Sequence, residues 1–272
     1  METVERARGG GLLLTRRAFL GVALGSSGLA GSLFAHEQAG EAIYTRLARE
    51  HGAGEVRQDG RRAGGDGTAW LTVEGTPIDY PVALPGPDTP QGYYLDHDID
   101  GTPRAAGCPY LDERCELDGT HLIVYGHRIG DSDTMFSGLW DRYRQESFDE
   151  LGDALLESPV AGSVRFTPLL AVRVPGSFAP IQRFSFEDAE DLGFWLESMA
   201  LMASAVSEQA DALIERAVRV LTLVTCSEGN GHSGTRTLVL FVHGDADAPR
   251  SQEAAGYSAA SAATSGGVDP KV

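Results

Sequence analysis

The clearest hydrophobic pattern in the chain is a pair of apolar runs, rich in β-branched residues, near its C-terminal end. The runs cover Val218–Thr225 and Thr235–Val242, and a polar, glycine-rich segment separates them. This pattern predicts two strands joined by a loop. Cys226 directly follows the first run, and Arg236 lies at the start of the second.

Other apolar runs predict further strands in the same part of the chain. They lie at Thr68–Val73, Leu122–Tyr125 and Val164–Val174, and glycine and proline residues repeatedly interrupt the segment between 75 and 87. Many short strands with this punctuation favour a barrel or a sandwich over alternating strands and helices. We therefore expect a mainly β fold.

Three segments have helical spacing of apolar residues. Glu41–Glu50 predicts a helix ahead of the first strand, and Thr134–Tyr143 predicts an amphipathic helix packed on the core. The longest helical pattern covers Phe186–Arg216, with acidic residues at its start, where a helix N-terminus favours them. Its apolar face consists of Leu192, Trp195, Leu196, Met199, Met202 and Val206.

The first 35 residues have the pattern of a membrane-targeting segment. Met1–Arg17 is basic, and Ala18–Ala35 contains no charged residue. The uncharged part is near the lower length limit for crossing a bilayer. We favour an uncleaved signal anchor; the alternative is a removed export signal, for which TRRAFLG resembles a twin-arginine sequence. Both place the rest of the chain outside the cytoplasm, and the anchor makes it a single-pass protein of the cell membrane.

The composition therefore divides the chain into four parts. Residues 1–35 form the basic segment and signal anchor or export signal, and residues 36–67 a helix followed by a glycine- and arginine-rich linker. Residues 68–244 form one folded domain. Residues 245–272 are rich in alanine, serine and glycine without an apolar period, and we expect them to be disordered.

The charge of the chain excludes one class of partner. The formal net charge is −17, from 39 acidic and 22 basic residues. Because binding to a phosphate backbone needs basic patches, we expect no nucleic-acid partner.

The cysteine count leaves the redox state open. The chain has three cysteines, Cys108, Cys115 and Cys226. An odd number in an exported protein indicates a free thiol or an intermolecular bond. A bond between Cys108 and Cys115 would leave Cys226 free, and two unconnected thiols are the alternative.

Three residues at strand ends are candidates for nucleophilic catalysis: Cys226, Arg236 and His127, which follows the run ending at Tyr125. Alone, the cysteine is more often a small buried residue, the histidine a structural one and the arginine a surface charge. Together they provide the groups that catalysis by a cysteine nucleophile needs. A guanidinium favours a thiolate and stabilises an oxyanion, and an imidazole transfers protons near neutral pH.

The sequence around these residues resembles the class B sortases, the cysteine transpeptidases of Gram-positive bacteria. LTLVTC at 221–226, with Arg236 ten positions after the cysteine, is similar to the sortase signature, and YGHRIGDSDTMF at 125–136 is similar to the sortase histidine block. GTPIDYPV at 75–82, GYYLDHDIDG at 92–101 and GCPYLDERC at 107–115 fit the class B subfamily. The resemblance covers about Trp70 to Gly244.

This resemblance implies a closed β-barrel of about eight strands over 68–244, with peripheral helices and a long helix before the cysteine strand. It implies that Cys226 attacks a backbone carbonyl, that Arg236 stabilises the oxyanion and that His127 transfers protons. The implied partners are the C-terminal sorting signal of an exported protein and an amine of a peptidoglycan precursor or a pilin. Arg128 and Cys115 stand where asparagine is common in class B, so substrate preference does not carry over.

No metal or cofactor is expected. Asp96, Asp98 and Asp100 have the spacing of a calcium loop but lack its distant glutamate, and His97–Asp98 matches a structural position of the family. Zinc at Cys226, His127 and His232 would lack the usual ligand pairing.

Two other functions are alternatives. Water in place of the amine would make the same residues a hydrolytic cysteine peptidase, although the papain-type signature is absent. A non-catalytic surface module with a sortase-like barrel is the second alternative.

Overall fold

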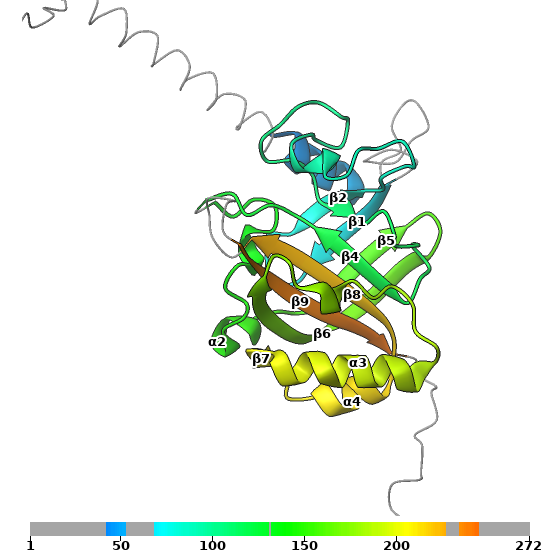
Figure 1. Cartoon of the computed structure of the whole chain (residues 1–272). Helices are drawn as coiled ribbons and strands as arrows, with labels where there is room; N and C mark the ends of the chain where they lie inside the picture. The colour runs from blue at the N-terminus through cyan, green and yellow to red at the C-terminus, as the bar shows by residue number, and fades with distance from the viewer. Residues whose placement is uncertain (1–41, 53–67, 131, 227–233, 245–272) are drawn as a thin grey trace, which may run out of the picture.

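The strands of the protein form one continuous sheet. A computed structural model describes residues 42–52, 68–130, 132–226 and 234–244 (Figure 1). Over these residues the sheet has nine strands in the order β5-β1-β2-β3-β4-β8-β9-β6-β7. Their bounds are β1 Thr68–Val73, β2 Asp79–Ala83, β3 Tyr110–Leu111, β4 His121–Tyr125, β5 Ala154–Ser158, β6 Gly162–Pro175, β7 Ala205–Val206, β8 Ala217–Cys226 and β9 Thr235–Gly244.

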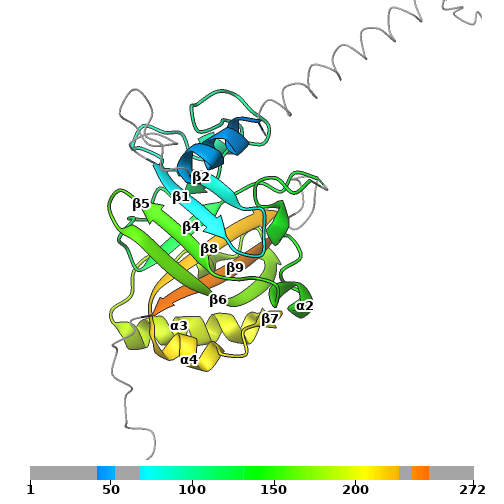
Figure 2. The ribbon, with the colours of Figure 1, turned by 180° about the vertical axis from the view of Figure 1, so that it is seen from behind.

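The sheet closes into a barrel because β5 pairs with two partners. It is antiparallel to β1 on one side and to β6 on the other, so that eight strands form a ring (Figure 2). The short strand β7 adds to β6 outside that ring. The predicted closed barrel of about eight strands is therefore confirmed.

Alternating strand residues face two different hydrophobic clusters. On β8, Leu221 and Leu223 belong to the cluster that fills the barrel, whereas Val220 and Val224 belong to a second cluster that also contains Trp195. Successive residues of a strand point to opposite faces of a sheet, which explains this division. β8 is thus buried on both faces, and its even-numbered positions are on the outer face of the barrel.

Helices cover the outer face beside β8, β9 and β6 (Figure 1). The helices of the described residues are a helix at 42–52, α2 Gln145–Phe148, α3 Ala189–Met202 and α4 Ala210–Glu215, with 3₁₀ turns η1 Tyr93–Leu95, η2 Ser137–Leu139 and η3 Ala179–Ile181. α3 begins at Asp188, whose side chain accepts a hydrogen bond from the Asp191 amide, as a helix N-cap does.

The prediction of one long helix over 186–216 is wrong in its continuity. α3 and α4 are separated by β7, where the chain pairs with β6. The Ser204 amide donates to the Ala171 carbonyl (3.0 Å) and the Ser207 amide donates to the Leu169 carbonyl (2.8 Å). These backbone hydrogen bonds to a distant strand replace those that a continuous helix would make.

The predicted amphipathic helix over Thr134–Tyr143 is also absent. The segment contains only the 3₁₀ turn Ser137–Leu139, and Met135 has a positive φ of 52°, which no α-helix allows. Met135, Phe136 and Leu139 are nevertheless buried, so the prediction that these apolar residues pack on the core is confirmed.

The predicted helix over Glu41–Glu50 is confirmed at residues 42–52. Tyr44 and Leu47 pack with Trp70 of β1 and Cys108 in a third hydrophobic cluster. This helix therefore rests directly on the barrel.

The targeting segment at 1–35 and the tail at 245–272 lie outside the described residues. Within the part of the chain that the structure describes, every helix is too short or too polar to cross a bilayer.

Cys108 and Cys115 are unconnected thiols. Cys108 is buried, and its Sγ lies 3.3 Å from the Pro109 carbonyl oxygen. Cys115 Sγ accepts a hydrogen bond from the Ile123 amide at 3.3 Å. Of the two alternatives for this pair, the structure has the one without a disulfide.

Candidate active site

Three neighbouring strands bring the candidate residues to one level of the barrel. β8 is parallel to β4, with Tyr125 beside Val224, and antiparallel to β9, with Cys226 opposite Arg236. His127 lies two positions after Tyr125, and Cys226 lies two positions after Val224. The parallel register therefore puts His127 at the level of Cys226. We call His127, Cys226 and Arg236 the candidate row.

The backbone register also assigns the candidate row to one face. Val224, two positions before Cys226, and Leu238, two positions after Arg236, both belong to the cluster outside the barrel, and Tyr125 packs against that cluster. Positions separated by two share a face. The three positions of the candidate row are therefore on the outer face of the barrel. The side chain of Cys226 lies outside the described part of the chain.

Hydrogen bonds of the neighbouring backbone and of the ring hold His127 in this position. Gly126 follows β4, and its amide donates to the Val224 carbonyl (3.1 Å), which extends the ladder beyond the strand. His127 is half-buried, and its Nε2 lies 2.7 Å from the carbonyl oxygen of Leu95. The Phe136 amide donates to the His127 carbonyl (2.9 Å). The histidine is thus held through both its backbone and its ring.

Arg236 lies half-buried at the start of β9. Its Nη1 donates to the Thr235 carbonyl at 3.0 Å, and a Cβ added at Gly176 would be 3.8 Å from its Cζ. Burial raises the pKa of Tyr110 to about 12, with the charge of Asp112 adding to this effect, whereas the positive charge of Arg236 opposes it. The guanidinium is therefore close enough to Tyr110 to act on its ionisation.

An aromatic and apolar row lies one step from the candidate row on the same face. It consists of Tyr110, Tyr125, Val224 and Leu238, which are consecutive partners across β3, β4, β8 and β9. The rings of Tyr110 and Tyr125 stack with centroids 5.4 Å apart. We call these four residues the floor row; its two tyrosines are half-buried, and Val224 and Leu238 are buried.

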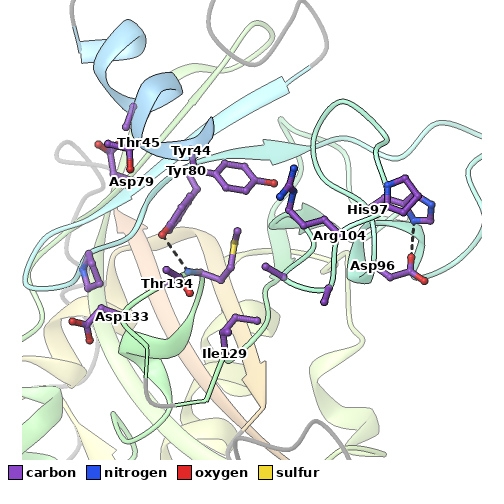
Figure 3. A pocket seen from close by; sticks show the side chains of 16 residues that line it. Tyr44, Thr45, Asp79, Tyr80, Asp96, His97, Arg104, Ile129, Asp133 and Thr134 are labelled. Carbon is purple, nitrogen blue, oxygen red and sulfur yellow. Dashed lines mark hydrogen bonds and ion pairs between the residues drawn. The ribbon is translucent and has the colours of Figure 1, made fainter. Parts of the chain in front are cut away.

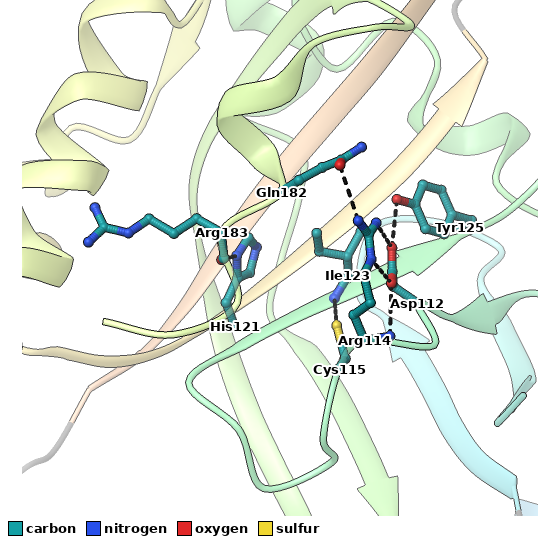
Figure 4. Close-up of polar contacts among 8 residues, drawn as sticks. All are labelled: Asp112, Arg114, Cys115, His121, Ile123, Tyr125, Gln182 and Arg183. Carbon is teal, nitrogen blue, oxygen red and sulfur yellow. Dashed lines mark hydrogen bonds and ion pairs between the residues drawn. The ribbon is translucent and has the colours of Figure 1, made fainter. Parts of the chain in front are cut away.

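A charged network fixes the floor row from one side (Figure 4). The Tyr125 hydroxyl donates to Asp112 Oδ2 at 3.0 Å, and Arg114 donates to both oxygens of the same carboxylate, at 2.8 and 2.7 Å. Burial raises the pKa of Asp112, but the hydrogen bonds from Arg114 and Tyr125 outweigh burial and hold it below its usual value. Burial likewise raises the pKa of Tyr125. At neutral pH Asp112 is therefore ionised and Tyr125 keeps its proton.

Sequence reasoning did not single out Tyr110, Tyr125 or Asp112 as site residues. All three lie in or beside the segments that resemble class B sortases, at 107–115 and 125–136. Tyr110 and Tyr125 occupy outward positions of short strands near the histidine. Recognising this placement requires the pairing of β3 with β4, which sequence alone does not supply.

The residues that depart from the class B pattern have structural contacts. The guanidinium of Arg128 lies 4.1 Å from the ring centroid of Trp140, a cation–π contact between the histidine loop and the turn that follows it. Cys115 lies under the Asp112 network, and burial raises its pKa to about 12.

The acidic run at 96–100 is a structural loop, as expected. Asp98 is buried, and its carboxylate accepts hydrogen bonds from the amides of Asp100 (3.1 Å) and Thr102 (2.9 Å) and from Arg104 Nε (3.2 Å). Among the residues that the structure describes, no three acidic, histidine or cysteine side chains are grouped as metal ligands would be. His232 lies outside those residues.

A cavity of about 1090 Å³ lies beside the histidine loop (Figure 3). The helix at 42–52 contributes Tyr44 and Thr45 to its lining, the loop after β2 contributes Asp96 and Arg104, and the histidine loop contributes Ile129. Among the residues whose side chains the structure describes, His127 and Arg236 do not line it.

Comparisons with known proteins agree with this arrangement. No protein-family model matches the sequence. Sortase B of Listeria monocytogenes is 35% identical over 105 residues, which is 36% of this chain and 41% of that protein. The chain thus matches less than half the length of this curated relative.

Solved structures with the same fold are sortases. Clostridium perfringens sortase B has 25% identity and a TM-score of 0.56 over 66% of this chain and 94% of that one. A Staphylococcus aureus sortase B–substrate complex has 21% identity and a TM-score of 0.62 over 76% and 97% of the two chains. Sortase B from B. anthracis in complex with AAEK1 has 15% identity and a TM-score of 0.59 over 77% and 98%. The last two likenesses concern the fold alone. In its partial sequence match to sortase B, its closed barrel and its similarity to the clostridial structure, the chain is similar to the class B sortases.

Proposed function

We propose that the protein is a cysteine transpeptidase that cleaves an exported protein at its C-terminal sorting signal and joins it to an amine. The observation that carries this proposal is the candidate row. A nucleophile, a proton-transfer group and a cation occupy one level of three adjacent strands, on the outer face of the barrel.

The reaction has two balanced halves. The Cys226 thiolate attacks the scissile carbonyl carbon, Arg236 stabilises the resulting oxyanion, and the C–N bond breaks as His127 gives a proton to the leaving amine. A thioester links substrate and enzyme. The incoming amine then attacks the thioester carbonyl and gives a proton to His127, and the thiolate leaves.

The family supports the choice of substrates. One of the similar structures is a sortase B–substrate complex, and another is a sortase B complexed with triglycine. For this chain we infer a sorting-signal peptide as acyl donor and an amine of a peptidoglycan precursor or a pilin as acceptor. Tyr110 and Tyr125, the half-buried members of the floor row, offer aromatic contacts for the donor peptide beside Cys226.

The same proposal places the catalytic domain outside the cell, tethered to the membrane through residues 1–35. The basic segment and the uncharged stretch that follows it support this orientation. Membrane fractionation of cells that express the full chain tests it, because release of a shortened soluble form would contradict the anchor.

Peptide profiling with and without an amine tests the activity. The full-length protein is incubated with a library of sorting-signal peptides, alone and with triglycine, and products are identified by mass spectrometry. We expect a ligated product when triglycine is present and an adduct at Cys226 in the intact protein. Hydrolysis that triglycine does not divert would indicate a peptidase, and the absence of any adduct would indicate a non-catalytic module.

Variants assign the roles within the site. Cys226→Ala should abolish turnover, whereas the matched control Cys115→Ala should retain it, because the Cys115 Sγ accepts a hydrogen bond from the Ile123 amide of β4 and is not part of the candidate row. Arg236→Lys keeps the charge but loses the guanidinium fork, and kcat should fall by about 10²-fold, as for loss of one oxyanion donor. Turnover by Cys226→Ala would remove the cysteine from its role.

A further inference from the structure

The ring of His127 has a defined partner on the side of the β2–β3 connection. Its Nε2 lies 2.7 Å from the Leu95 carbonyl oxygen. A carbonyl oxygen can only accept a hydrogen bond, so Nε2 must carry the proton of this contact. A neutral imidazole has one N–H, and therefore Nδ1 is the unprotonated nitrogen.

The backbone on both sides of Leu95 is tied to the rest of its loop. The Cys108 amide donates to the carbonyl of Tyr94 at 2.9 Å, and the Arg104 amide donates to the carbonyl of Asp96 at 2.7 Å. The carbonyl between these two contacts belongs to Leu95. Its direction is therefore set by the loop of residues 92–108 and not by the side chain of Leu95.

This loop has a core of its own, which makes it a rigid support. Asp98 is only 2% exposed, and its carboxylate binds two loop amides and Arg104. The Tyr44 hydroxyl of the helix at 42–52 donates to the Gly107 carbonyl at 2.9 Å. The loop is thereby attached to the N-terminal helix on one side and holds a carbonyl against the histidine on the other.

Gly107 is the position at which this arrangement can be disturbed most directly. It has a φ of +61°, and a Cβ there would lie 2.3 Å from the Tyr94 carbonyl oxygen and 2.8 Å from the Leu95 carbonyl oxygen. Distances this short exclude any side chain at Gly107 unless the carbonyls move. The loop closes on Leu95 only because residue 107 is a glycine.

We propose that the loop of residues 92–108 is a positioning element for catalysis: its Leu95 carbonyl holds His127 in the Nε2–H tautomer, which leaves Nδ1 to exchange protons with the leaving and incoming amines. This inference rests on the proposed transpeptidase function for the proton exchange. The tautomer itself is a property of the resting protein. The loop thus acts on the reaction through His127.

The tautomer is measured by ¹⁵N NMR of the imidazoles in full-length protein labelled at histidine. The chain has seven histidines, and His127→Gln identifies the signal by its loss. At a pH where the ring is neutral, we expect His127 to carry its proton on Nε2 in the wild-type protein. A proton on Nδ1 would overturn the proposal, whether or not the protein shows transferase activity.

Gly107→Ala and Gly101→Ala form a matched pair of variants. Gly101 lies in the same loop with a φ of +79°, but a Cβ there would meet only the Tyr93 hydroxyl, at 3.1 Å. Both alanines strain the loop, and only the one at residue 107 displaces the Leu95 carbonyl. Gly107→Ala should mix the two tautomers and lower kcat by about 10²-fold, with a smaller change in KM. Gly101→Ala should keep the wild-type tautomer and most of kcat.

The outcomes distinguish the positioning of His127 from the proposed transpeptidase function. If both variants lose the Nε2–H tautomer and kcat to the same extent, the loop matters only for folding, which contradicts the proposal. A wild-type Nε2–H tautomer that Gly107→Ala leaves unchanged would also contradict it. If no peptide transfer is found but the tautomer shifts as expected in Gly107→Ala, the proposed function fails and the positioning of His127 stands.

Discussion

His121 offers a test of how burial on the outer face of the barrel couples stability to pH. It begins β4, at the end opposite His127, and is 1% exposed beneath α3 (Figure 4). Its Nδ1 donates to the Arg183 carbonyl at 2.6 Å, its Nε2 accepts from the Thr222 hydroxyl at 2.8 Å, and its ring lies 4.9 Å from that of Trp195. Neither contact provides a carboxylate for a second proton.

The pKa of His121 is therefore lower in the folded protein. Burial lowers it to about 4, and the Arg183 carbonyl and the charge of Asp112 oppose this only in part. Below about pH 6.5 the unfolded chain takes up a proton that the folded chain does not, so stability is present above that pH and is lost as pH falls toward 4. The difference is about 3 kcal/mol in all, of which about 2 kcal/mol is lost between pH 7 and pH 5.

Urea unfolding of the full-length protein at pH 7, 6 and 5, at constant ionic strength, measures this loss. The variant His121→Asn retains a donor but cannot titrate, so its free energy of unfolding should fall by about 2 kcal/mol less than that of the wild type over the same interval. The titration of Asp112 does not contribute to this pH dependence. Its pKa lies below the usual value, so its stabilisation is lost only at lower pH. Parallel pH dependences of variant and wild type would refute the reasoning.

Two further predictions concern the site and its thiols. In Gly126→Ala, the added Cβ would lie 2.4 Å from the fully buried ring of Phe136, so the variant should lose about 2 kcal/mol of stability, and Phe136→Leu should restore part of it in thermal melts. No restoration in the double variant would show that the ring is not the obstacle. Burial raises the pKa of Cys108 and of Cys115 to about 12 each, so brief alkylation of the native protein near pH 8 should label Cys226 alone, and denaturation without reductant should expose all three thiols to labelling. Intact mass distinguishes these states, and labelling of Cys108 in the native protein would contradict its burial.

Several features of the protein could be predicted from the sequence because they depend on local pattern. The runs that predict β1, β4, β6, β8 and β9 all became strands with bounds close to those expected, since a run of apolar, β-branched residues is a property of a short segment. The candidate residues were also found in this way. Cys226 and Arg236 stand at the ends of such runs, and His127 stands just beyond one.

Other features depend on contacts between distant segments, and for these the local pattern was misleading or silent. The helix predicted over 186–216 is interrupted where Ala205 and Val206 pair with β6. The helix predicted over 134–143 is replaced by a 3₁₀ turn that follows Phe136, whose ring packs against Gly126. In both places tertiary contacts outweighed a helical preference that amounts to fractions of a kcal/mol per residue.

The candidate site divides in the same way. The sequence by itself determined which side chains are candidates for the chemistry, because a thiol, an imidazole and a guanidinium are chosen residue by residue. Only the tertiary structure decided that β4, β8 and β9 are neighbours in a register that aligns His127, Cys226 and Arg236, and that a carbonyl from residue 95 reaches the histidine. Strand register and loop closure are set by packing across the whole barrel, which no segment of the chain contains on its own.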